Sequence, residues 1–154
     1  GMRIVVMGPS GSGKSLVGAA VAAALRAEFI DGDDLHPRAN IAKMSAGVAL
    51  TDADRAPWLD AVAAALHRPR IVVACSALRR AYRDRIRSLA PGTVFVELVV
   101  PPAQLRTRVS RRDHFMPATL IDSQLATLEP LASDEAGGVQ GETLRVCGQN
   151  MVGK

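Results

Sequence analysis

The fold of this chain is decided by the stretch Gly8-Pro9-Ser10-Gly11-Ser12-Gly13-Lys14-Ser15. It matches the pattern G-x-x-x-x-G-K-[ST] in full; an apolar run (residues 4–7) precedes it and a segment rich in Ala, Val and Leu (residues 16–25) follows it. A strand, a glycine-rich loop and a helix in this order turn backbone N–H groups toward one point, which is a binding site for phosphate. The alternative is a glycine turn with an ordinary surface lysine, and the complete motif in this context favours the phosphate site.

The chemistry of this loop indicates its ligands. Lys14 can reach the β- and γ-phosphates of ATP, and the Ser15 hydroxyl can bind Mg²⁺. Glycines let the backbone wrap closely around phosphate oxygens. We therefore expect ATP and Mg²⁺ as cofactors and Lys14 as a catalytic residue. The nucleotide-binding residues expected here are Gly8, Ser10, Gly11, Ser12, Gly13, Lys14, Ser15 and Leu16.

Length and composition limit the class of protein. The 154 residues, 48% of them apolar, suit one domain (residues 1–154) with a real core and argue against disorder. No apolar run is long enough to span a membrane, and no signal peptide is recognised. The two cysteines, Cys75 and Cys147, have no metal-ligand spacing. We expect a cytoplasmic protein with reduced thiols and no membrane partner, and expect Cys75 to be a buried residue rather than a nucleophile.

A basic segment at residues 79–87 raises the question of nucleic acid. The formal net charge of +4 suits nucleic acid, but it suits polyphosphate and an anionic small substrate equally. Arginines at helical spacing spread around this segment and Asp84 interrupts them, which predicts a solvated helix face. Because aromatic residues for base stacking are scarce, we expect no nucleic-acid partner.

Apolar strand-like runs alternate with helical segments along the chain. This alternation predicts an α/β fold, with a mainly parallel sheet, helices on both faces and ligands at the carboxyl ends of the strands. Trp58 recurs with apolar residues at helical spacing, which predicts a core position rather than a cofactor contact. Strands are expected at residues 3–7, 28–31, 70–75, 93–100 and 143–146, and helices at residues 14–26, 38–45, 55–67, 79–89, 102–111 and 118–128.

Three carboxylates follow the second expected strand, in the sequence Phe29-Ile30-Asp31-Gly32-Asp33-Asp34-Leu35-His36. One of them could hold a Mg²⁺-bound water and another could accept a proton from a substrate hydroxyl. The alternative is a turn cluster that caps a helix, since aspartate is common there. Glu97 lies within the fourth strand rather than at its carboxyl end, so we expect it to be structural.

A second basic segment, residues 108–117, lies between two expected helices after the fourth strand. In a small kinase this is the place of a mobile lid, whose arginines can neutralise charge on the transferred phosphoryl group. The alternative is a solvated basic loop, and the position of the segment favours the lid.

Taken with their spacing, these clusters resemble the bacterial-type gluconate kinases, small P-loop enzymes related in fold to shikimate and nucleoside monophosphate kinases. The likeness covers about residues 7–135. Its most specific elements are the pair His36-Pro37 and the stretch Asp54-Arg55-Ala56-Pro57-Trp58-Leu59. It also includes Asn40-Ile41-Ala42-Lys43-Met44, Ala74-Cys75-Ser76-Ala77-Leu78, His114-Phe115-Met116-Pro117, Ser123-Gln124 and Leu128-Glu129-Pro130-Leu131.

The resemblance implies a P-loop kinase with a five-stranded parallel sheet in the order 2-3-1-4-5. It implies transfer of the γ-phosphoryl group of ATP to the 6-hydroxyl of D-gluconate. It is also compatible with a homodimer. Asp31 resembles the acid near the metal, and Asp33 the residue that orients or deprotonates the acceptor hydroxyl. Arg55 resembles the arginine that faces the substrate carboxylate, and His36 and Ser76 are further substrate-binding residues. The lid arginines are Arg108, which binds nucleotide, and Arg111, which is catalytic.

Two other functions stay open at this stage. One is another small-molecule kinase of the same fold, acting on a different hydroxylated acid or on a nucleoside monophosphate. The other is a nucleotide-binding module without turnover. This alternative is considered because the C-terminal residues 136–154 are irregular and lack the final helix that the resemblance leads us to expect. A shorter connection at residues 67–70, Arg79 in place of lysine and Ala49 in place of proline are milder departures from the family pattern.

Overall fold

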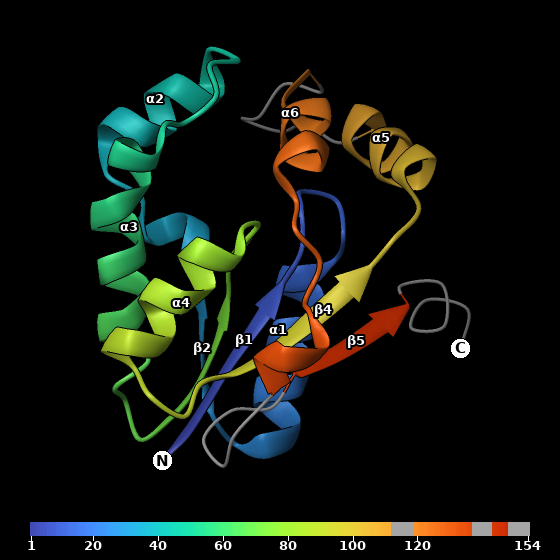
Figure 1. The fold of residues 1–154 in the computed structure, drawn as a ribbon. Coiled ribbons are helices and arrows are strands. Elements are labelled where there is room, and N and C mark those ends of the chain that lie inside the picture. Colours follow the sequence, from blue (N-terminus) through green and yellow to red (C-terminus); the bar gives the residue numbers. More distant parts are fainter. Residues whose placement is uncertain (112–118, 137–142, 148–154) are drawn as a thin grey trace.

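The computed structural model of this protein describes residues 1–111, 119–136 and 143–147. Its centre is a sheet of strands in the order β2-β3-β1-β4-β5, and all neighbouring strands are parallel (Figure 1). The α/β class with a parallel sheet is therefore confirmed, as is the order of β2, β3, β1 and β4. The strands are β1 (Met2–Met7), β2 (Glu28–Asp31), β3 (Arg70–Ala74), β4 (Val94–Val99) and β5 (Thr143–Cys147), the last lying beside β4.

The order of helices and strands along the chain is the one that the sequence predicted. There are also two short 3₁₀ helices that the sequence did not predict. One follows β2 directly, and the other lies between α6 and β5. The helices are α1 (Lys14–Leu25), α2 (Arg38–Ser45), α3 (Asp52–Ala65), α4 (Arg80–Leu89), α5 (Pro102–Arg111) and α6 (Thr119–Thr127), and the 3₁₀ helices are η1 (Gly32–Leu35) and η2 (Ser133–Ala136).

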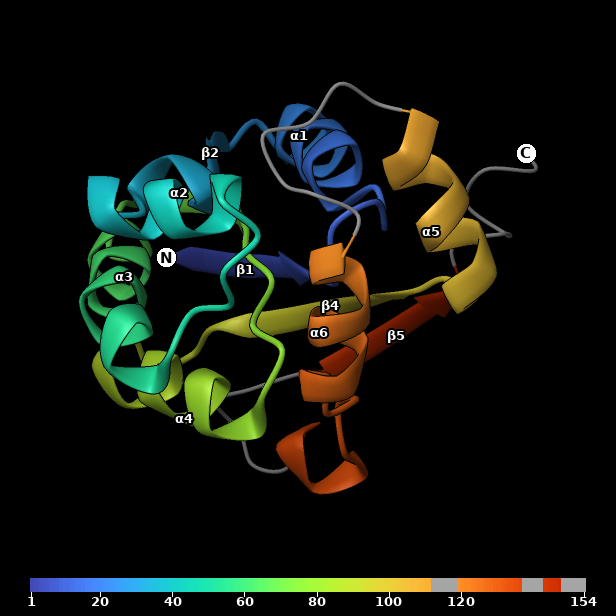
Figure 2. The same ribbon diagram turned by 90° about the horizontal axis from the view of Figure 1, so that it is seen from above.

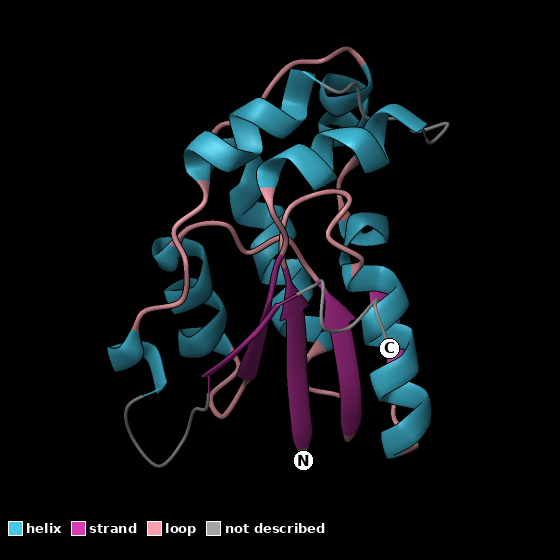
Figure 3. Ribbon diagram, turned by 90° about the vertical axis from the view of Figure 1, so that its right-hand side faces the viewer, coloured by secondary structure: helices cyan, strands magenta, loops and turns pink. Residues whose placement is uncertain are grey.

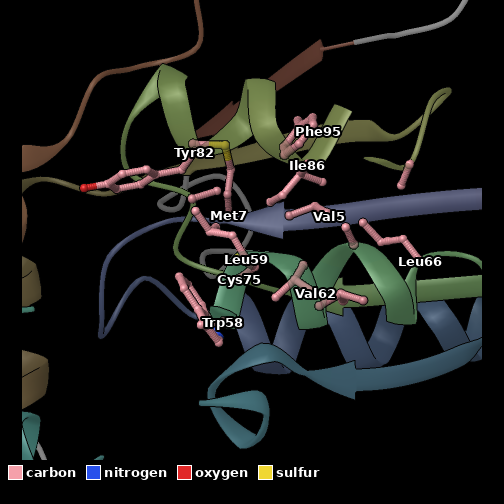
Figure 4. Packing of buried hydrophobic residues seen from close by; sticks show 14 of the residues in the cluster. Val5, Met7, Trp58, Leu59, Val62, Leu66, Cys75, Tyr82, Ile86 and Phe95 are labelled. Atoms are coloured by element: carbon pink, nitrogen blue, oxygen red, sulfur yellow. The ribbon is translucent and has the colours of Figure 1, made fainter. Parts of the chain in front are cut away.

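Helices cover both faces of the sheet (Figure 3), and β1 shows why. Successive side chains of a strand point to opposite faces. Val5 and Met7 belong to the apolar cluster formed with α3 and α4, whereas Val6 belongs to the cluster formed with α1. All three side chains are fully buried, so this strand is apolar on both faces, as parallel sheets require. Figure 4 shows residues of α3 and α4 converging on β1 in the first cluster.

Helix α3 begins three residues earlier than the sequence predicted. Thr51 caps it: its side chain accepts a hydrogen bond from the Asp54 N–H at 3.1 Å, and the Asp54 carboxylate accepts one from the Thr51 N–H at 2.9 Å. This reciprocal capping box satisfies two N–H groups that a helix start leaves without partners. Pro57 therefore lies inside the helix and not in its first turn, which corrects the expected boundary at residue 55.

The prediction of a solvated arginine face on α4 is wrong for Arg83 and Arg87. The Arg83 side chain is fully buried and forms two hydrogen bonds with Glu135 of η2, at 2.7 and 2.9 Å. Arg87 reaches the same carboxylate at 2.7 Å. Burial opposes ionisation of Glu135, but the hydrogen bonds from Arg83, the Ala132 N–H and Arg87 outweigh it and hold its pKa at about 2. This ionic cluster fastens η2 to α4.

Glu97 of β4 is structural, as expected. It is 2% exposed, and its carboxylate accepts a hydrogen bond from the Leu131 N–H at 3.0 Å. Beyond the carboxyl ends of the strands lie α2, α5 and α6, which Figure 2 shows from above. Among the described helices, none has the length and apolar character that crossing a bilayer would need.

Candidate active site

The phosphate-binding loop adopts a conformation that suits its motif. It joins β1 to α1, and Gly11 and Gly13 have positive φ angles of 82° and 90°. These are left-handed conformations that glycine adopts without steric cost. Space for an added Cβ at Gly13 is open, with no atom within 4 Å. The first N–H groups of α1 have no preceding helical carbonyl to bond, so they are available to an anion at this end.

The Ser12 hydroxyl tests whether a phosphate group fits this loop. Its Oγ is buried and has no hydrogen-bond partner among the described residues. A buried polar atom without a partner is costly, and a phosphate oxygen held by the loop would supply the missing one. Lys14 is also almost buried, with 7% of its surface exposed. The residues present therefore fit a bound polyphosphate.

Ser15 and Asp31 meet where the first turn of α1 faces the end of β2. The Ser15 hydroxyl donates a hydrogen bond to Asp31 Oδ2 at 2.9 Å, and Asp31 Oδ1 accepts one from the Asp33 N–H at 3.0 Å. Asp31 is thus both the N-cap of η1 and the partner of Ser15, which agrees with the helix-cap interpretation; the metal role of the acidic cluster stays a prediction. Within the described residues, no group of three or more acidic, histidine or cysteine side chains could hold a metal ion. An ion at Ser15 and Asp31 would need phosphate oxygens and water to complete its shell, which is the usual way that proteins bind Mg²⁺.

Gly32 is required by the close approach of η1 to β3. A Cβ at this position would collide with the carbonyl oxygen of Ala74 at the end of β3. The Gly32 carbonyl in turn accepts a hydrogen bond from Trp58 Nε1 at 2.8 Å. Asp33, the next residue, lines the cavity described below. The glycine between the aspartates therefore lets Asp33 sit against the end of the sheet.

A partly open cavity connects the phosphate loop with the acidic segment. Ser10 and Lys14 line one part, and Asp33, His36, Arg55 and Ser76 line another. The cavity therefore brings together all four residues that were predicted to bind the substrate. Its other lining residues are Met44, Val48, Ala49, Leu50, Trp58, Leu78, Ser123, Gln124 and Thr127.

Arg55 enters the cavity from the second turn of α3. Its Nη1 donates a hydrogen bond to the Tyr82 hydroxyl at 2.9 Å, and that hydroxyl donates to Asp52 Oδ1 at 2.7 Å. The guanidinium carbon lies 5.0 Å from the centre of the Tyr82 ring. Nε and Nη2 have no hydrogen-bond partner in the described part of the chain. Arg55 is thus held on one side and presents free donors on the other, as recognition of a carboxylate requires.

His36 and Trp58 form a stacked pair in the cavity wall. Their ring centroids are 4.1 Å apart and their planes differ by 12°. Burial, helped by the positive charge of Arg55, lowers the pKa of His36 to about 4, so the ring is neutral at pH 7. Trp58 is 1% exposed and belongs to the main apolar cluster, as predicted, but it also lines the cavity.

Helix α6 also contacts the phosphate loop. Gln124 accepts a hydrogen bond from the Ser10 N–H at 2.8 Å and donates one to the Ser10 hydroxyl at 3.3 Å. From α5, Arg108 Nη1 donates to the Gly11 carbonyl at 2.8 Å. Arg111 is the last residue of α5, and its side chain lies outside what the structure describes, as do residues 112–117 of the predicted lid.

The loop after β3 supplies Ser76. The preceding Cys75 is fully buried, which raises the pKa of its thiol to about 12 and leaves it un-ionised, so the prediction that it is no nucleophile is supported. Ala77 has a positive φ of 42°, which is uncommon for a residue other than glycine. Its carbonyl accepts a hydrogen bond from the buried Arg83 at 2.8 Å. The ionic cluster on α4 therefore helps to hold the loop that carries Ser76.

Comparison with known proteins gives the family. A family model described as an AAA domain matches residues 4–131. A thermosensitive gluconokinase of Escherichia coli is 45% identical over 141 residues, which span 88% of this chain and 75% of that protein. A gluconokinase of Gluconobacter oxydans is 47% identical over 139 residues, which span 86% of this chain and 78% of that protein. This chain belongs to the gluconokinase family.

Solved structures agree with this membership. The crystal structure of a gluconokinase from Sinorhizobium meliloti has a TM-score of 0.79 at 49% identity, covering 94% of this chain and 82% of that one. A shikimate kinase from Bacteroides thetaiotaomicron has a TM-score of 0.62 at 19% identity, covering 82% of this chain and 77% of that one. The second likeness shows that this chain shares its fold with that shikimate kinase.

Several residues that line the cavity or contact its lining were not predicted from the sequence. Thr127 lies in no motif and at no spacing that points to a site. Asn40, Leu78 and Gln124 lie in stretches that carry the family resemblance, but the resemblance gave them no role. Tyr82, which accepts the hydrogen bond from Arg55, lies within the arginine-rich segment, where the sequence pattern indicates only a charged helix face. A family alignment is the signal that could have found them.

Proposed function

We propose that this protein transfers the γ-phosphoryl group of ATP to the 6-hydroxyl of D-gluconate. The observation that carries the proposal is the single cavity that joins Lys14 of the phosphate loop to Asp33 and Arg55, in a chain of the gluconokinase family. A donor site and an acceptor site that share one cavity suit direct transfer, because catalysis of phosphoryl transfer is mainly positioning and charge stabilisation.

Each residue has a role that its surroundings support. Lys14, which is almost buried, meets the negative charge on the phosphates. Asp33 accepts the proton of the attacking hydroxyl. Arg55 binds the acceptor carboxylate through the donors that Tyr82 leaves free. Ser76 donates or accepts a hydrogen bond with the sugar hydroxyls.

Mg²⁺ would be held by Ser15 and Asp31 and would neutralise charge on the phosphates. The remaining nucleotide contacts come from free backbone N–H groups of the phosphate loop and of the first turn of α1.

We further propose that residues 108–117 close over the nucleotide as a lid. Arg108 supports this, because it lies on α5 and already contacts the phosphate loop at Gly11. In the lid, Arg108 binds the nucleotide and Arg111 stabilises the transferred phosphoryl group. Closure would exclude water, and hence prevent loss of the phosphoryl group to hydrolysis.

The partner that this site selects is a small anionic molecule. Arg83 and Arg87 are paired with Glu135, so the arginine-rich helix presents fewer free cations than its sequence suggests. This disfavours nucleic acid as a partner, because backbone contacts from Lys and Arg dominate such binding. With ATP as donor, we place the reaction in the cytoplasm.

An acceptor panel tests the proposal. Purified protein with ATP and Mg²⁺ is assayed for ADP release with D-gluconate, shikimate, a neutral hexitol and a nucleoside monophosphate. We expect ADP release with gluconate well above that with the others, and a product phosphorylated at the 6-hydroxyl by ³¹P NMR. Lys14→Ala is the control for contaminating kinases. Preference for another acceptor would assign a different kinase of the same fold, and ATP binding without acceptor-dependent ADP release would indicate a nucleotide-binding module.

A further inference from the structure

The side-chain amide of Asn40 in α2 has two hydrogen bonds that determine its orientation. Its Nδ2 donates to the Asp54 carbonyl oxygen at 2.9 Å and also lies 3.1 Å from His36 Nδ1. The opposite orientation of the amide would bring two oxygen acceptors together at Asp54. Asn40 is 3% exposed, so water does not compete for these contacts. The amide nitrogen, with both of its hydrogens committed, therefore faces the histidine.

This orientation determines which nitrogen of His36 carries the proton. Since Asn40 donates, His36 Nδ1 must accept, and an accepting imidazole nitrogen has no hydrogen. The neutral ring then has its hydrogen on Nε2. Burial and the neighbouring positive charge of Arg55 keep the pKa of the ring near 4, in agreement with a neutral form.

The plane of the imidazole is also fixed. One face stacks on Trp58, and Trp58 is itself held by its hydrogen bond to the Gly32 carbonyl. Asn40 holds the Nδ1 edge, so the ring cannot rotate without losing either the stacking or the hydrogen bond. His36 Nε2 has no hydrogen-bond partner within the described residues, and it is not among their fully buried, unpaired polar atoms. His36 lines the cavity that contains Lys14 and Arg55.

We propose that Asn40 is a positioning residue that locks His36 as an Nε2–H donor, which binds an oxygen of the polyhydroxy-acid acceptor. This rests on the proposed function. His36 then serves recognition and not proton abstraction, because its accepting nitrogen is occupied by Asn40. The hydrogen bond acts alongside Arg55, so the carboxylate and one further oxygen of the acceptor are bound from the same side of the cavity.

The chain offers variants that separate these effects. His36→Phe keeps a ring to stack on Trp58 but removes the donor. His36→Gln removes the stacking but keeps an N–H near the position of Nε2. Asn40→Leu removes the donor that selects the tautomer. Lys43→Gln is the matched control, because Lys43 also ties α2 to the start of α3, through the Asp54 carboxylate at 2.7 Å, yet it does not contact His36.

The first measurement is independent of catalysis. The ¹⁵N NMR spectrum of the folded wild-type protein at pH 7, with His36 assigned by its absence in His36→Phe, should show a protonated Nε2 and an unprotonated Nδ1. In Asn40→Leu the two tautomers should mix, and in Lys43→Gln they should not. An Nδ1–H tautomer of His36 in the wild type would overturn the inference even if Asn40→Leu failed to fold.

The second measurement is kinetic. We expect His36→Phe to raise the KM for gluconate by about tenfold, the usual scale of one hydrogen bond, with the KM for ATP unchanged. Asn40→Leu should raise the gluconate KM by a smaller factor, and His36→Gln should fall between His36→Phe and the wild type. Lys43→Gln should stay near the wild type. A normal gluconate KM in His36→Phe would refute the inference and leave the proposed function intact. Absence of gluconate turnover in the wild type would instead refute the proposed function, and the acceptor contact with it.

Discussion

Replacement of Glu135 by alanine should destabilise the protein strongly, although the residue lies outside the cavity. Arg83 and Glu135 have fully buried side chains, so the variant leaves a guanidinium without its counter-ion in the interior. Breaking a buried ion pair from one side costs about 3–5 kcal/mol. For a domain of this size that corresponds to a melting temperature lower by about 6–20 °C. Glu135→Gln, which keeps an acceptor for Arg83, should fall between the wild type and the alanine variant.

The same helix supplies the control. Arg85 also pairs with a carboxylate, Asp60, at 2.7 Å, but these side chains are 45% and 47% exposed. Asp60→Ala should change the unfolding free energy little, because exposed ion pairs are weak. The assay is urea unfolding followed by circular dichroism. Equal losses for Asp60→Ala and Glu135→Ala would refute the argument from burial.

A double-mutant cycle separates the charge from the packing. Arg83→Met combined with Glu135→Leu removes both buried charges, so the pair should lose less stability than the sum of the two single changes. Additive losses would mean that the two groups do not act on each other, whatever their distance.

Three further predictions concern the cavity and its histidine. Asp33→Asn should reduce turnover far more than ATP affinity measured by calorimetry, because an amide cannot accept the hydroxyl proton; equal loss of both would move Asp33 to the nucleotide side. Arg55→Ala should lower the preference for gluconate over a neutral hexitol by roughly ten- to a hundredfold, the scale of a charge-assisted hydrogen bond, and an unchanged preference would exclude Arg55 as the carboxylate site. Wild-type stability should fall as the pH drops from 6.5 towards 4, since unfolded His36 takes up a proton in that window while the folded ring, with a pKa of about 4, does not. His36→Phe should show a shallower decline in urea titrations over the same window, and an identical slope would contradict the lowered pKa.

Local patterns predicted most of the fold. The bounds of β2, α2 and α5 agree with those expected, because apolar periodicity and turn residues are local signals. The predicted start of α3, at residue 55, was three residues too late. Pro57 favours a start close before it, but the capping box of Thr51 and Asp54 determines the actual start. The burial of Arg83 could not be predicted, since its partner lies 52 residues away and no periodicity encodes that contact.

The site divides in the same way. The phosphate loop and Asp31 could be predicted, because a contiguous motif or the end of a strand determines where they lie. Tyr82 beside Arg55 and Asn40 beside His36 could not, because they depend on how α2, α3 and α4 meet. The role of the Asn40 amide depends on its simultaneous contacts with Asp54 and His36, and the sequence alone does not indicate these contacts.

The hydrogen bond from Arg108 to Gly11 has a consequence for the entropy of nucleotide binding. A long side chain that must be ordered when a ligand arrives costs about 0.5–1.5 kcal/mol in lost rotamer freedom. Arg108 is anchored to the phosphate loop by a contact within the protein itself, made through one N–H group. The other N–H groups of the same guanidinium are thereby held near the loop. We expect an arginine ordered in this way to contribute to ATP binding at a lower entropic cost than a free side chain would.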